Sequence, residues 1–326
     1  MRQLRLGATS MVVSAIGQGC ALFSEGYGSP NDERSLEALA AAVDSGLTYF
    51  DTADAYGVGH NEQLLGRFLE GRRGLTVATK VGLIRKPGAP SAISNSPEHI
   101  RASCEASLQR LGVECLDLYY LQRRDLSVPI EEAIGAMAAL VQEGKVRALG
   151  LSEVSAQTLK AAHAVHPIAA VQSEYSLWSR DPEAHVLPAC REIGATFIAY
   201  CPLGRGFFGG QVVSLEGLDR GDFRRFIPRF QAGLLEKNRT LLPALAAFAD
   251  ERGVTPAQIA LAWLLNKHPH VIAIPGSRQP QHIRDNAAAA DLHLGAAEIA
   301  RVEAFFPPAA VAGARLPPPA MAGIES

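Results

Sequence analysis

Short apolar runs alternate with longer amphipathic segments along this chain, and this alternation restricts its fold more than any other feature of the sequence. The apolar runs have the length of strands and lie at residues 15–19, 47–51, 75–80, 115–121, 146–152, 168–172, 195–200 and 271–275. Segments with helical spacing lie between them, at residues 33–45, 61–69, 97–111, 129–143, up to His163 and before Gly194. Ser96 followed by Pro97 is a typical helix start. Strands that alternate with helices indicate right-handed crossovers and therefore a parallel α/β sheet.

Eight strand–helix units in 326 residues have the size of a closed (β/α)8 TIM barrel. The periodicity alone leaves an open, doubly wound sheet as the alternative. We predict a short N-terminal hairpin and, after the seventh strand, a long inserted loop over Gly204–Asn238, because the interval from Tyr200 to Val271 exceeds one loop and one helix. The expected organisation is one domain over residues 1–306 and an irregular Pro- and Ala-rich tail over 307–326.

Charge and cysteine usage exclude several classes of protein. The formal net charge of −2 removes a global electrostatic case for binding nucleic acid. No apolar run approaches the roughly 18 residues that a membrane span requires, and the first residues do not resemble a signal peptide. The five cysteines are scattered and form no Cys-x-x-Cys pair, which is typical of a reducing compartment. We therefore expect a cytoplasmic enzyme with a small-molecule substrate, and the sequence carries no signal of its oligomeric state.

Three local patterns imitate binding motifs. Residues 204–209, GRGFFG, match a dinucleotide-binding fingerprint, but no strand ending in an acidic residue follows. A glycine loop that approaches a phosphate remains open for this segment. His163 and His166 have no neighbouring carboxylate or cysteine, so we predict no metal site. A basic stretch in the long loop is either a solvated face or a phosphate-facing surface, and it comprises Arg220, Arg224, Arg225 and Arg229.

The most informative constellation joins two neighbouring strands. Asp51 ends one predicted strand, Lys80 ends the next, and Tyr56 lies in the loop after the first. In a barrel all three side chains reach the carboxyl end, where barrel active sites lie. A lysine ammonium favours the phenolate of a nearby tyrosine, and this would make Tyr56 a proton donor or acceptor. The alternative is a structural Asp–Lys pair beside a tyrosine that only lines a wall.

These residues belong to a series of motifs that together resemble the aldo-keto reductases. The motifs cover nearly the whole chain in that family's order, and they read FDTADAYG, ATK, LGVECLDLYYL, GKVRALGLSEVS, VQSEYSLWSRDPE, AYCPLGRGFF, TPAQIALAWLL and IPGSRQPQHIRDN. The resemblance is strongest to bacterial and plant reductases of the quinone- and auxin-induced-protein type. It implies a (β/α)8 barrel that binds NADPH or NADP+ in extended form across the strand ends.

The resemblance also assigns catalytic roles. The family's aspartate, tyrosine and lysine match Asp51, Tyr56 and Lys80, but its usual histidine is replaced by Gln122 in YYLQRRD. An amide can donate a hydrogen bond to a carbonyl oxygen, but it cannot titrate near neutral pH as histidine does.

Further positions match the family's cofactor site, with one departure. They are Ser152, Gln172, Tyr200, Pro202, Leu203, Gly204, Arg205, Gly206, Gly276, Ser277, Arg278, His282 and Asn286. In that family the residues matching Ser152 and Gln172 hold the nicotinamide carboxamide, and those matching 202–206 form the loop beside the pyrophosphate. Arg278 is expected to bind the 2′-phosphate. The family's Ser-Asn pair reads Ser152-Glu153 here, so the second contact is in question. From their places after strands we expect four residues to line the substrate pocket, namely Phe23, Tyr27, Leu83 and Trp178.

The expected function is NADPH-dependent interconversion of a carbonyl compound (an aldehyde, a ketone or a sugar) and its alcohol. Hydride would move between the nicotinamide and the carbonyl carbon, with Tyr56 transferring the proton. The alternative is an NADPH-binding redox-sensing or regulatory protein with weak turnover, which the missing histidine favours and the intact set of Asp51, Tyr56 and Lys80 disfavours.

Overall fold

Eight parallel strands close on themselves to form a barrel in the computed structural model, which describes residues 1–86, 91–210 and 214–325. In the order of their hydrogen bonding the strands are β3 (Gln18–Gly19), β4 (Tyr49–Asp51), β5 (Thr76–Val81), β8 (Leu116–Leu121), β9 (Val146–Ser152), β10 (Ile168–Glu174), β11 (Thr196–Tyr200) and β12 (Val271–Ile274). A parallel bridge between Ile16 and Ala273 joins the first and last strands, and Gly17 N donates to Ala273 O at 2.9 Å. The predicted (β/α)8 barrel is confirmed, and the open sheet is excluded.

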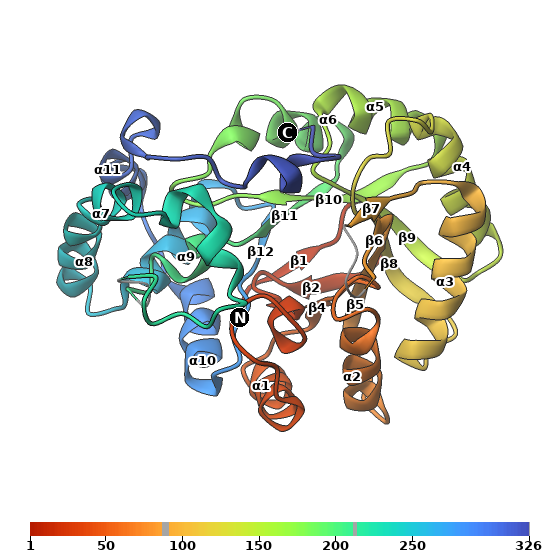
Figure 1. The fold of residues 1–326 in the computed structure, drawn as a ribbon, viewed down its shortest axis with the longest axis horizontal. Helices are drawn as coiled ribbons and strands as arrows, with labels where there is room; N and C mark the ends of the chain where they lie inside the picture. The colour runs from red at the N-terminus through yellow and green to blue at the C-terminus, as the bar shows by residue number, and fades with distance from the viewer. Residues whose placement is uncertain (87–90, 211–213, 326) are drawn as a thin grey trace.

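Helices surround the strands (Figure 1). They are α1 (Asp32–Asp44), α2 (His60–Leu69), α3 (Pro97–Leu111), α4 (Ile130–Gln142), α5 (Ala156–Val165), α6 (Val186–Ile193), α7 (Leu234–Arg239), α8 (Leu242–Glu251), α9 (Pro256–Lys267), α10 (Pro280–Ala288) and α11 (Ala296–Phe305). Local capping explains several boundaries: Ser96 accepts a hydrogen bond from His99 N, and Gly112 ends α3 in the left-handed conformation.

The N-terminal hairpin covers the amino end of the barrel. It consists of β1 (Gln3–Arg5) and β2 (Val12–Ser14), which are antiparallel, as the sequence predicts. Gly7 N donates to Thr196 Oγ1 at 2.7 Å. Gly7 has a φ of +57°, and a Cβ there would lie 2.4 Å from the carbonyl oxygen of Ala169. Glycine therefore permits the close approach that covers this end of the barrel.

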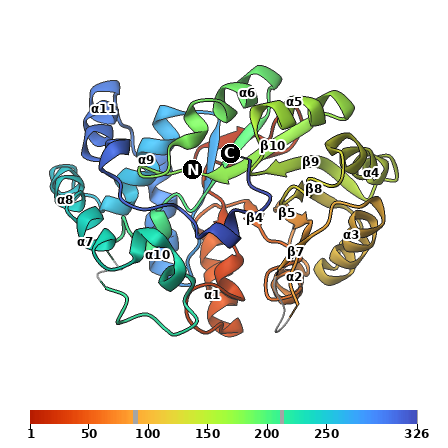
Figure 2. The same ribbon diagram turned by 45° about the horizontal axis from the view of Figure 1, so that its top comes forward.

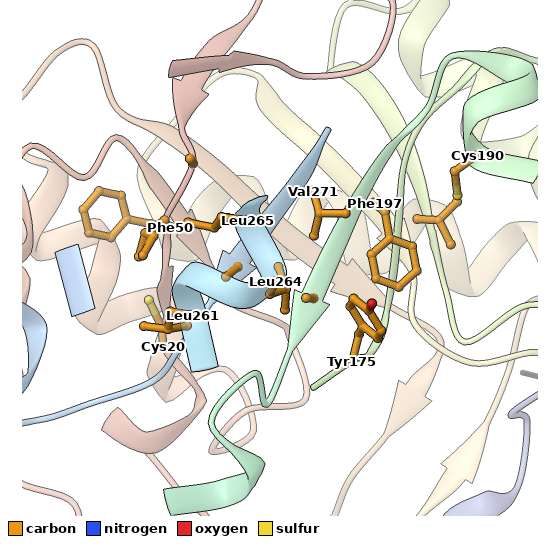
Figure 3. Close-up of a cluster of buried hydrophobic side chains, with 14 of the residues drawn as sticks. Cys20, Phe50, Tyr175, Cys190, Phe197, Leu261, Leu264, Leu265 and Val271 are labelled. Carbon is orange, nitrogen blue, oxygen red and sulfur yellow. The ribbon is translucent and has the colours of Figure 1, made fainter. Parts of the chain in front are cut away.

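Two apolar layers stabilise the barrel. The larger layer lies between strands and helices, where residues such as Phe50, Phe197 and Leu264 are buried (Figure 3). The smaller layer fills the barrel interior and includes Tyr49 and Tyr120, whose hydroxyls lie 3.2 Å apart. Burying this much apolar surface is the main favourable term for folding. The interior is filled toward the amino end, and the polar side chains of the strands gather at the other end.

The long loop and the tail lie near the carboxyl end of the barrel. The described part of 204–238 carries η3 (Gly204–Gly206), η4 (Phe223–Phe226), η5 (Pro228–Phe230) and the first residues of α7, whereas residues 211–213 lie outside the described part. The predicted irregular tail contains η7 (Pro308–Ala310) and η8 (Pro318–Met321). Figure 2 shows this dark blue segment crossing in front of the strands. No helix within the described ranges is long and apolar enough to cross a membrane.

Candidate active site

A cavity of about 1660 Å³ lies at the carboxyl ends of the strands. Its lining includes all four residues predicted to be catalytic, namely Asp51, Tyr56, Lys80 and Gln122. This volume exceeds the roughly 300–1,000 Å³ of a typical small-molecule pocket, so the cavity has room for a large cofactor together with a substrate. A second cavity, of about 1140 Å³, lies outside the barrel between α2 and α3, and its lining includes none of the predicted site residues.

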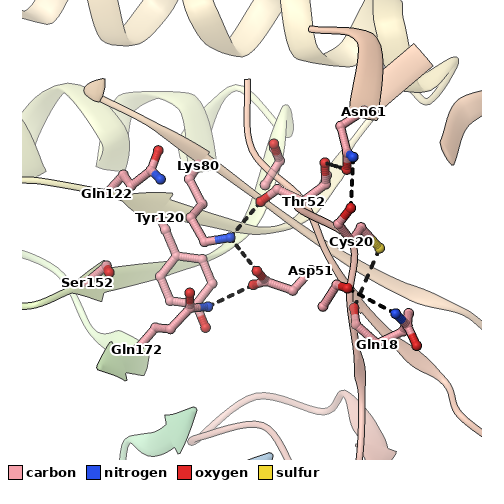
Figure 4. A network of polar contacts seen from close by, with 12 residues as sticks. Gln18, Cys20, Asp51, Thr52, Asn61, Lys80, Tyr120, Gln122, Ser152 and Gln172 are labelled. Atoms are coloured by element: carbon pink, nitrogen blue, oxygen red, sulfur yellow. Dashed lines mark hydrogen bonds and ion pairs between the residues drawn. The ribbon is translucent and has the colours of Figure 1, made fainter. Parts of the chain in front are cut away.

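A buried ion pair forms the centre of the site (Figure 4). The register of β4 against β5 brings Asp51 and Lys80 together: Asp51 pairs with Ala78, two residues before the lysine. Lys80 Nζ donates to Asp51 Oδ1 and, at 2.6 Å, to the carbonyl oxygen of Thr52. Only 3 % of the aspartate side chain and 1 % of the lysine side chain are exposed. Burial opposes the ammonium form, but Asp51 and Tyr56 together outweigh it, so the pKa of Lys80 is raised.

Gln172 extends this network. Its register partner on β9 is Ser152, so the two residues predicted to hold the nicotinamide carboxamide lie side by side. Gln172 Nε2 also donates to Asp51 Oδ2 at 2.7 Å (Figure 4). Gln172 therefore orients Asp51 as well as lining the cavity.

Tyr56 lies above Lys80, with the ammonium nitrogen 5.1 Å from the centroid of its ring. Burial is the largest influence on the tyrosine and raises its pKa, whereas Lys80 acts in the opposite direction. Lys80 therefore lowers the pKa of Tyr56, as expected, but burial raises it by more, and the net pKa of Tyr56 is raised. At neutral pH Tyr56 carries its proton and is suited to donate it.

Polar contacts hold the Tyr56 loop in place. Asn61 Nδ2 donates to the carbonyl oxygen of Cys20 and to Ser24 Oγ, each at 2.8 Å. Thr52 Oγ1 in turn donates to Asn61 Oδ1 at 2.7 Å. These bonds connect the loop after β4 to the end of β3, so the tyrosine is held by a rigid frame.

Gln122 follows β8 and is 5 % exposed. Its backbone N donates to the carbonyl oxygen of Val81 at 2.8 Å, which fixes it beside β5. Within the described residues its side-chain oxygen, Oε1, is buried and has no hydrogen-bond partner. A buried acceptor without a donor destabilises a protein by about 1–3 kcal/mol. The Gln122 amide is therefore a candidate for hydrogen bonding to a bound ligand.

The residues predicted to bind the cofactor line the same cavity, with one exception. Those on its wall are Ser152, Gln172, Tyr200, Pro202, Leu203, Arg205, Gly206, Gly276, Ser277, Arg278, His282 and Asn286. Gly204 is buried beneath the loop instead, and a Cβ there would lie 2.9 Å from the Trp178 ring. Arg278 donates to the carbonyl oxygens of Tyr27 and, at 2.5 Å, Ser29, and therefore connects the two sides of the cavity.

The structure places two of the four residues predicted to line the substrate pocket on the cavity wall. Tyr27 and Leu83 line the cavity. Phe23 and Trp178 are buried in the core instead, because large apolar side chains pack under the loops that follow their strands. Trp178 stacks on Phe207 with ring centroids 4.1 Å apart.

The two histidines and part of the basic stretch make contacts within the fold, and Arg224 also lines the cavity. His163 Nδ1 accepts a hydrogen bond from Ile168 N at 3.1 Å, and His166 contacts the carbonyl oxygen of Pro167. In the basic stretch Arg224 pairs with Asp222, and Arg229, which is largely buried, donates to Ser179 Oγ at 2.6 Å. Across the described ranges, no group of three His, Cys, Asp or Glu side chains is arranged to hold a metal.

Glu153 departs from the role that the resemblance implies for this position. It is not on the cavity wall; Arg315 of the tail donates to both of its carboxylate oxygens, at 2.9 and 2.8 Å. Glu153 has a φ of +58°, a conformation that asparagine tolerates better than glutamate. The carboxylate that replaces the family's amide therefore anchors the tail.

Sequence reasoning missed the contribution of the tail. Its residues on the cavity wall are Leu316, Pro317, Pro319, Ala320 and Ala322. Arg124 N donates to the carbonyl oxygen of Gly323 at 3.1 Å, and Glu325 Oε2 accepts from Ser155 N at the start of α5. The signal available in the sequence was a pair of charges, Arg315 and Glu325, within an otherwise apolar segment.

Comparisons with known proteins agree with this geometry. The sequence pattern of the Aldo/keto reductase family matches residues 15–306. Probable aldo-keto reductase 1 from Glycine max is 41 % identical over 318 residues, which cover 97 % of this chain and 92 % of that protein.

Solved structures are similar over the same extent. The glycerol dehydrogenase from Gluconobacter oxydans has a TM-score of 0.85 at 30 % identity, over 94 % of this chain and 96 % of that one. An aldo/keto reductase from Klebsiella pneumoniae in complex with NADP and acetate has a TM-score of 0.73 at 30 % identity, over 97 % and 98 % of the two chains. On the strength of the barrel, its site and these matches, the chain belongs to the aldo/keto reductase family of oxidoreductases.

Proposed function

We propose that this protein uses NADPH or NADP+ to interconvert a small carbonyl compound and its alcohol by hydride transfer. The observation that carries this proposal is the buried Asp51–Lys80 pair beneath Tyr56, at one end of a cavity large enough for a dinucleotide. A neutral tyrosine beside a fixed ammonium is a proton donor whose anion is stabilised as it forms.

The cavity contains groups that suit this cofactor. Ser152 and Gln172 offer a hydroxyl and an amide near the catalytic pair. Arg278 lies at another part of the wall and supplies a guanidinium suited to a phosphate. The buried Nε of Arg205 has no partner in the described part of the chain and lies in the loop predicted to contact the pyrophosphate. When bound, the nicotinamide would supply the hydride.

The protein's own side chains control the proton and the reacting oxygen. Tyr56 donates its proton to the oxygen in reduction and accepts it in oxidation. Lys80 stabilises the phenolate, and Asp51, fixed by Gln172, holds the ammonium in place. The Gln122 amide provides a further hydrogen-bond donor for the oxygen but has no proton to exchange at neutral pH.

The relatives support this class of reaction. The Gluconobacter oxydans relative is a glycerol dehydrogenase, which favours an alcohol or the matching carbonyl compound as substrate. The Klebsiella pneumoniae relative has been solved with NADP, which favours the phosphorylated cofactor.

A single-turnover measurement tests the proposal against a regulatory protein with weak turnover. The protein is loaded with one equivalent of NADPH and mixed with 4-nitrobenzaldehyde, and the loss of nicotinamide absorbance is followed. We expect complete oxidation of the bound cofactor, followed by repeated turnover when NADPH is in excess. Tight binding of NADPH without oxidation would favour the regulatory role, and absence of NADPH binding would contradict both.

A further inference from the structure

Arg123 is a cation of the cavity wall whose contacts are all neutral. It follows Gln122 directly and is half-buried. Within the described residues, its guanidinium donates to the carbonyl oxygen of Gln122 at 2.8 Å and reaches Ser152 Oγ at 3.4 Å. These two contacts place the charge between the proposed reacting centre and a proposed nicotinamide contact.

Four other cations on the cavity wall each have a carboxylate partner. Lys80 pairs with Asp51, Arg85 with Glu25, Arg205 with Glu174 and Arg224 with Asp222. Glu153, the residue after Ser152, accepts hydrogen bonds from both terminal nitrogens of Arg315. Within the described residues these five carboxylates are paired with other cations, and none of them forms an ion pair with Arg123.

The described part of the tail, residues 307–325, forms no ion pair with Arg123, and its carboxylate, that of Glu325, pairs with Arg124 at 3.6 Å. The tail's residues on the cavity wall are apolar: Leu316, Pro317, Pro319, Ala320 and Ala322. A half-buried guanidinium beside an apolar wall is partly desolvated, which strengthens its attraction for an anion. Its planar fork matches a carboxylate or a phosphate.

We infer that Arg123 binds an anionic group of the substrate, so that the natural substrate is a small oxo acid, a hydroxy acid or a phosphorylated carbonyl compound. This inference rests on the proposed function, since it names the substrate class of the same site. Arg278 binds the phosphate of the cofactor elsewhere on the wall, and Arg123 binds the anionic group of the substrate beside Gln122. Each arginine thereby recognises a different ligand.

Matched aldehydes test the inference. The kcat/KM values for 4-carboxybenzaldehyde and 4-nitrobenzaldehyde are compared in wild type, Arg123→Met, Arg123→Lys and Arg85→Met, and glyceraldehyde 3-phosphate is compared with glyceraldehyde. A hydrogen-bonded charge contributes about 1.5–3 kcal/mol. Arg123→Met should therefore lower the ratio of kcat/KM for the charged aldehyde to that for the neutral aldehyde about 10- to 100-fold, mainly through KM.

Two further variants serve as controls. Arg123→Lys should keep part of the preference for the charged aldehyde, and Arg85→Met should leave this ratio of kcat/KM values unchanged. A preference for only one of the two anions identifies the group as carboxylate or phosphate. Equal losses on charged and neutral substrates would overturn the inference.

A binding measurement separates this inference from the proposed reaction. Calorimetric titration of the NADP+-loaded protein with benzoate and with benzamide requires no turnover. We expect benzoate to bind wild type at least about 10-fold more tightly than Arg123→Met, with benzamide bound equally by both. Equal benzoate affinities would overturn the inference even in an active enzyme. A large loss of NADPH affinity in Arg123→Met would assign this arginine to the cofactor instead.

Discussion

Gln122 is the residue that, by the resemblance to the family, stands where a catalytic histidine is usual. The sequence predicted its position in the site, and the structure places it on the cavity wall beside Lys80. Its unpartnered oxygen could not be predicted, because hydrogen bonding depends on neighbours that are distant in sequence. The amide differs from imidazole mainly in lacking a titratable proton near neutral pH.

Substitution of Gln122 measures what the amide contributes. If it acts as a neutral donor to the reacting oxygen, Gln122→His should raise kcat/KM for reduction of 4-nitrobenzaldehyde, and Gln122→Ala should lower it. One well-placed donor is worth about 10²–10³ in rate, which bounds both effects. Steady-state rates of the three proteins at one pH provide the test. Equal rates would mean that residue 122 does not contact the reacting oxygen.

Asp54 is a half-buried carboxyl group in the loop that carries Tyr56. Burial raises its pKa to about 7, Glu62 adds to this effect, and Arg110 opposes it. One of its oxygens, Oδ1, has no partner within the described residues. The unfolded chain has a pKa of about 3.9 at this residue. Between these two values the folded state holds a proton that the unfolded state has lost, so the contribution of Asp54 to stability falls as pH rises from about 4 to about 7.

Asp54→Asn should therefore stabilise the protein in a pH-dependent manner. We expect its free energy of unfolding to exceed that of wild type by about 1–3 kcal/mol at pH 8. The difference should shrink toward zero near pH 4, where both side chains are neutral. Urea unfolding across pH 4–8 measures it. A constant difference, or a lower stability of Asp54→Asn at pH 8, would contradict this account.

At the scale of elements, the sequence predicted those whose signals are local. The helix expected at 97–111 has these bounds in the structure because Ser96, Pro97 and Gly112 set its ends. The pairing of β6 (Leu83–Ile84) with β7 (Ala92–Ile93) was not predicted, since each strand has two residues and no visible period. The path of the tail was also missed, because it depends on long-range contacts such as that between Arg315 and Glu153.

The Arg315–Glu153 pair should determine whether the tail stays on the barrel. Arg315→Met leaves a fully buried carboxylate without its cation, which typically costs about 3–5 kcal/mol. We expect lower stability in urea and faster proteolysis within 307–325. The double variant Glu153→Leu, Arg315→Met removes both charges and should recover much of the loss. Wild-type protease resistance in Arg315→Met would show that the tail is held by other contacts.

The whole molecule combines a barrel closed by a hairpin at one end with a cavity at the other. The alternation of strands and helices predicted the barrel size, and the family motifs predicted which strand ends carry the site. The motifs did not predict that Phe23 and Trp178 turn into the core, because a position after a strand does not fix the direction of a side chain. Tertiary packing determines the direction of these two side chains.

The choice of cofactor is a property of the whole cavity. Arg278 bonds to backbone carbonyls of Tyr27 and Ser29 from the opposite wall, and a 2′-phosphate offers it a stronger, charged partner. Arg278→Ala should weaken NADPH binding by about 1.5–3 kcal/mol and leave NADH binding nearly unchanged, as measured by fluorescence titration. Equal losses for the two cofactors would remove Arg278 from phosphate recognition.

In the proposed reaction Tyr56, placed over the Lys80–Asp51 pair, transfers the proton that accompanies hydride transfer. Stopped-flow mixing of NADPH-loaded wild type and Tyr56→Phe with 4-nitrobenzaldehyde tests it most directly, with NADPH dissociation constants measured on both proteins. We expect rapid oxidation of the cofactor by wild type and none on the same timescale by Tyr56→Phe, while the two NADPH dissociation constants agree within a few-fold. Oxidation by Tyr56→Phe at a rate near that of wild type would contradict it.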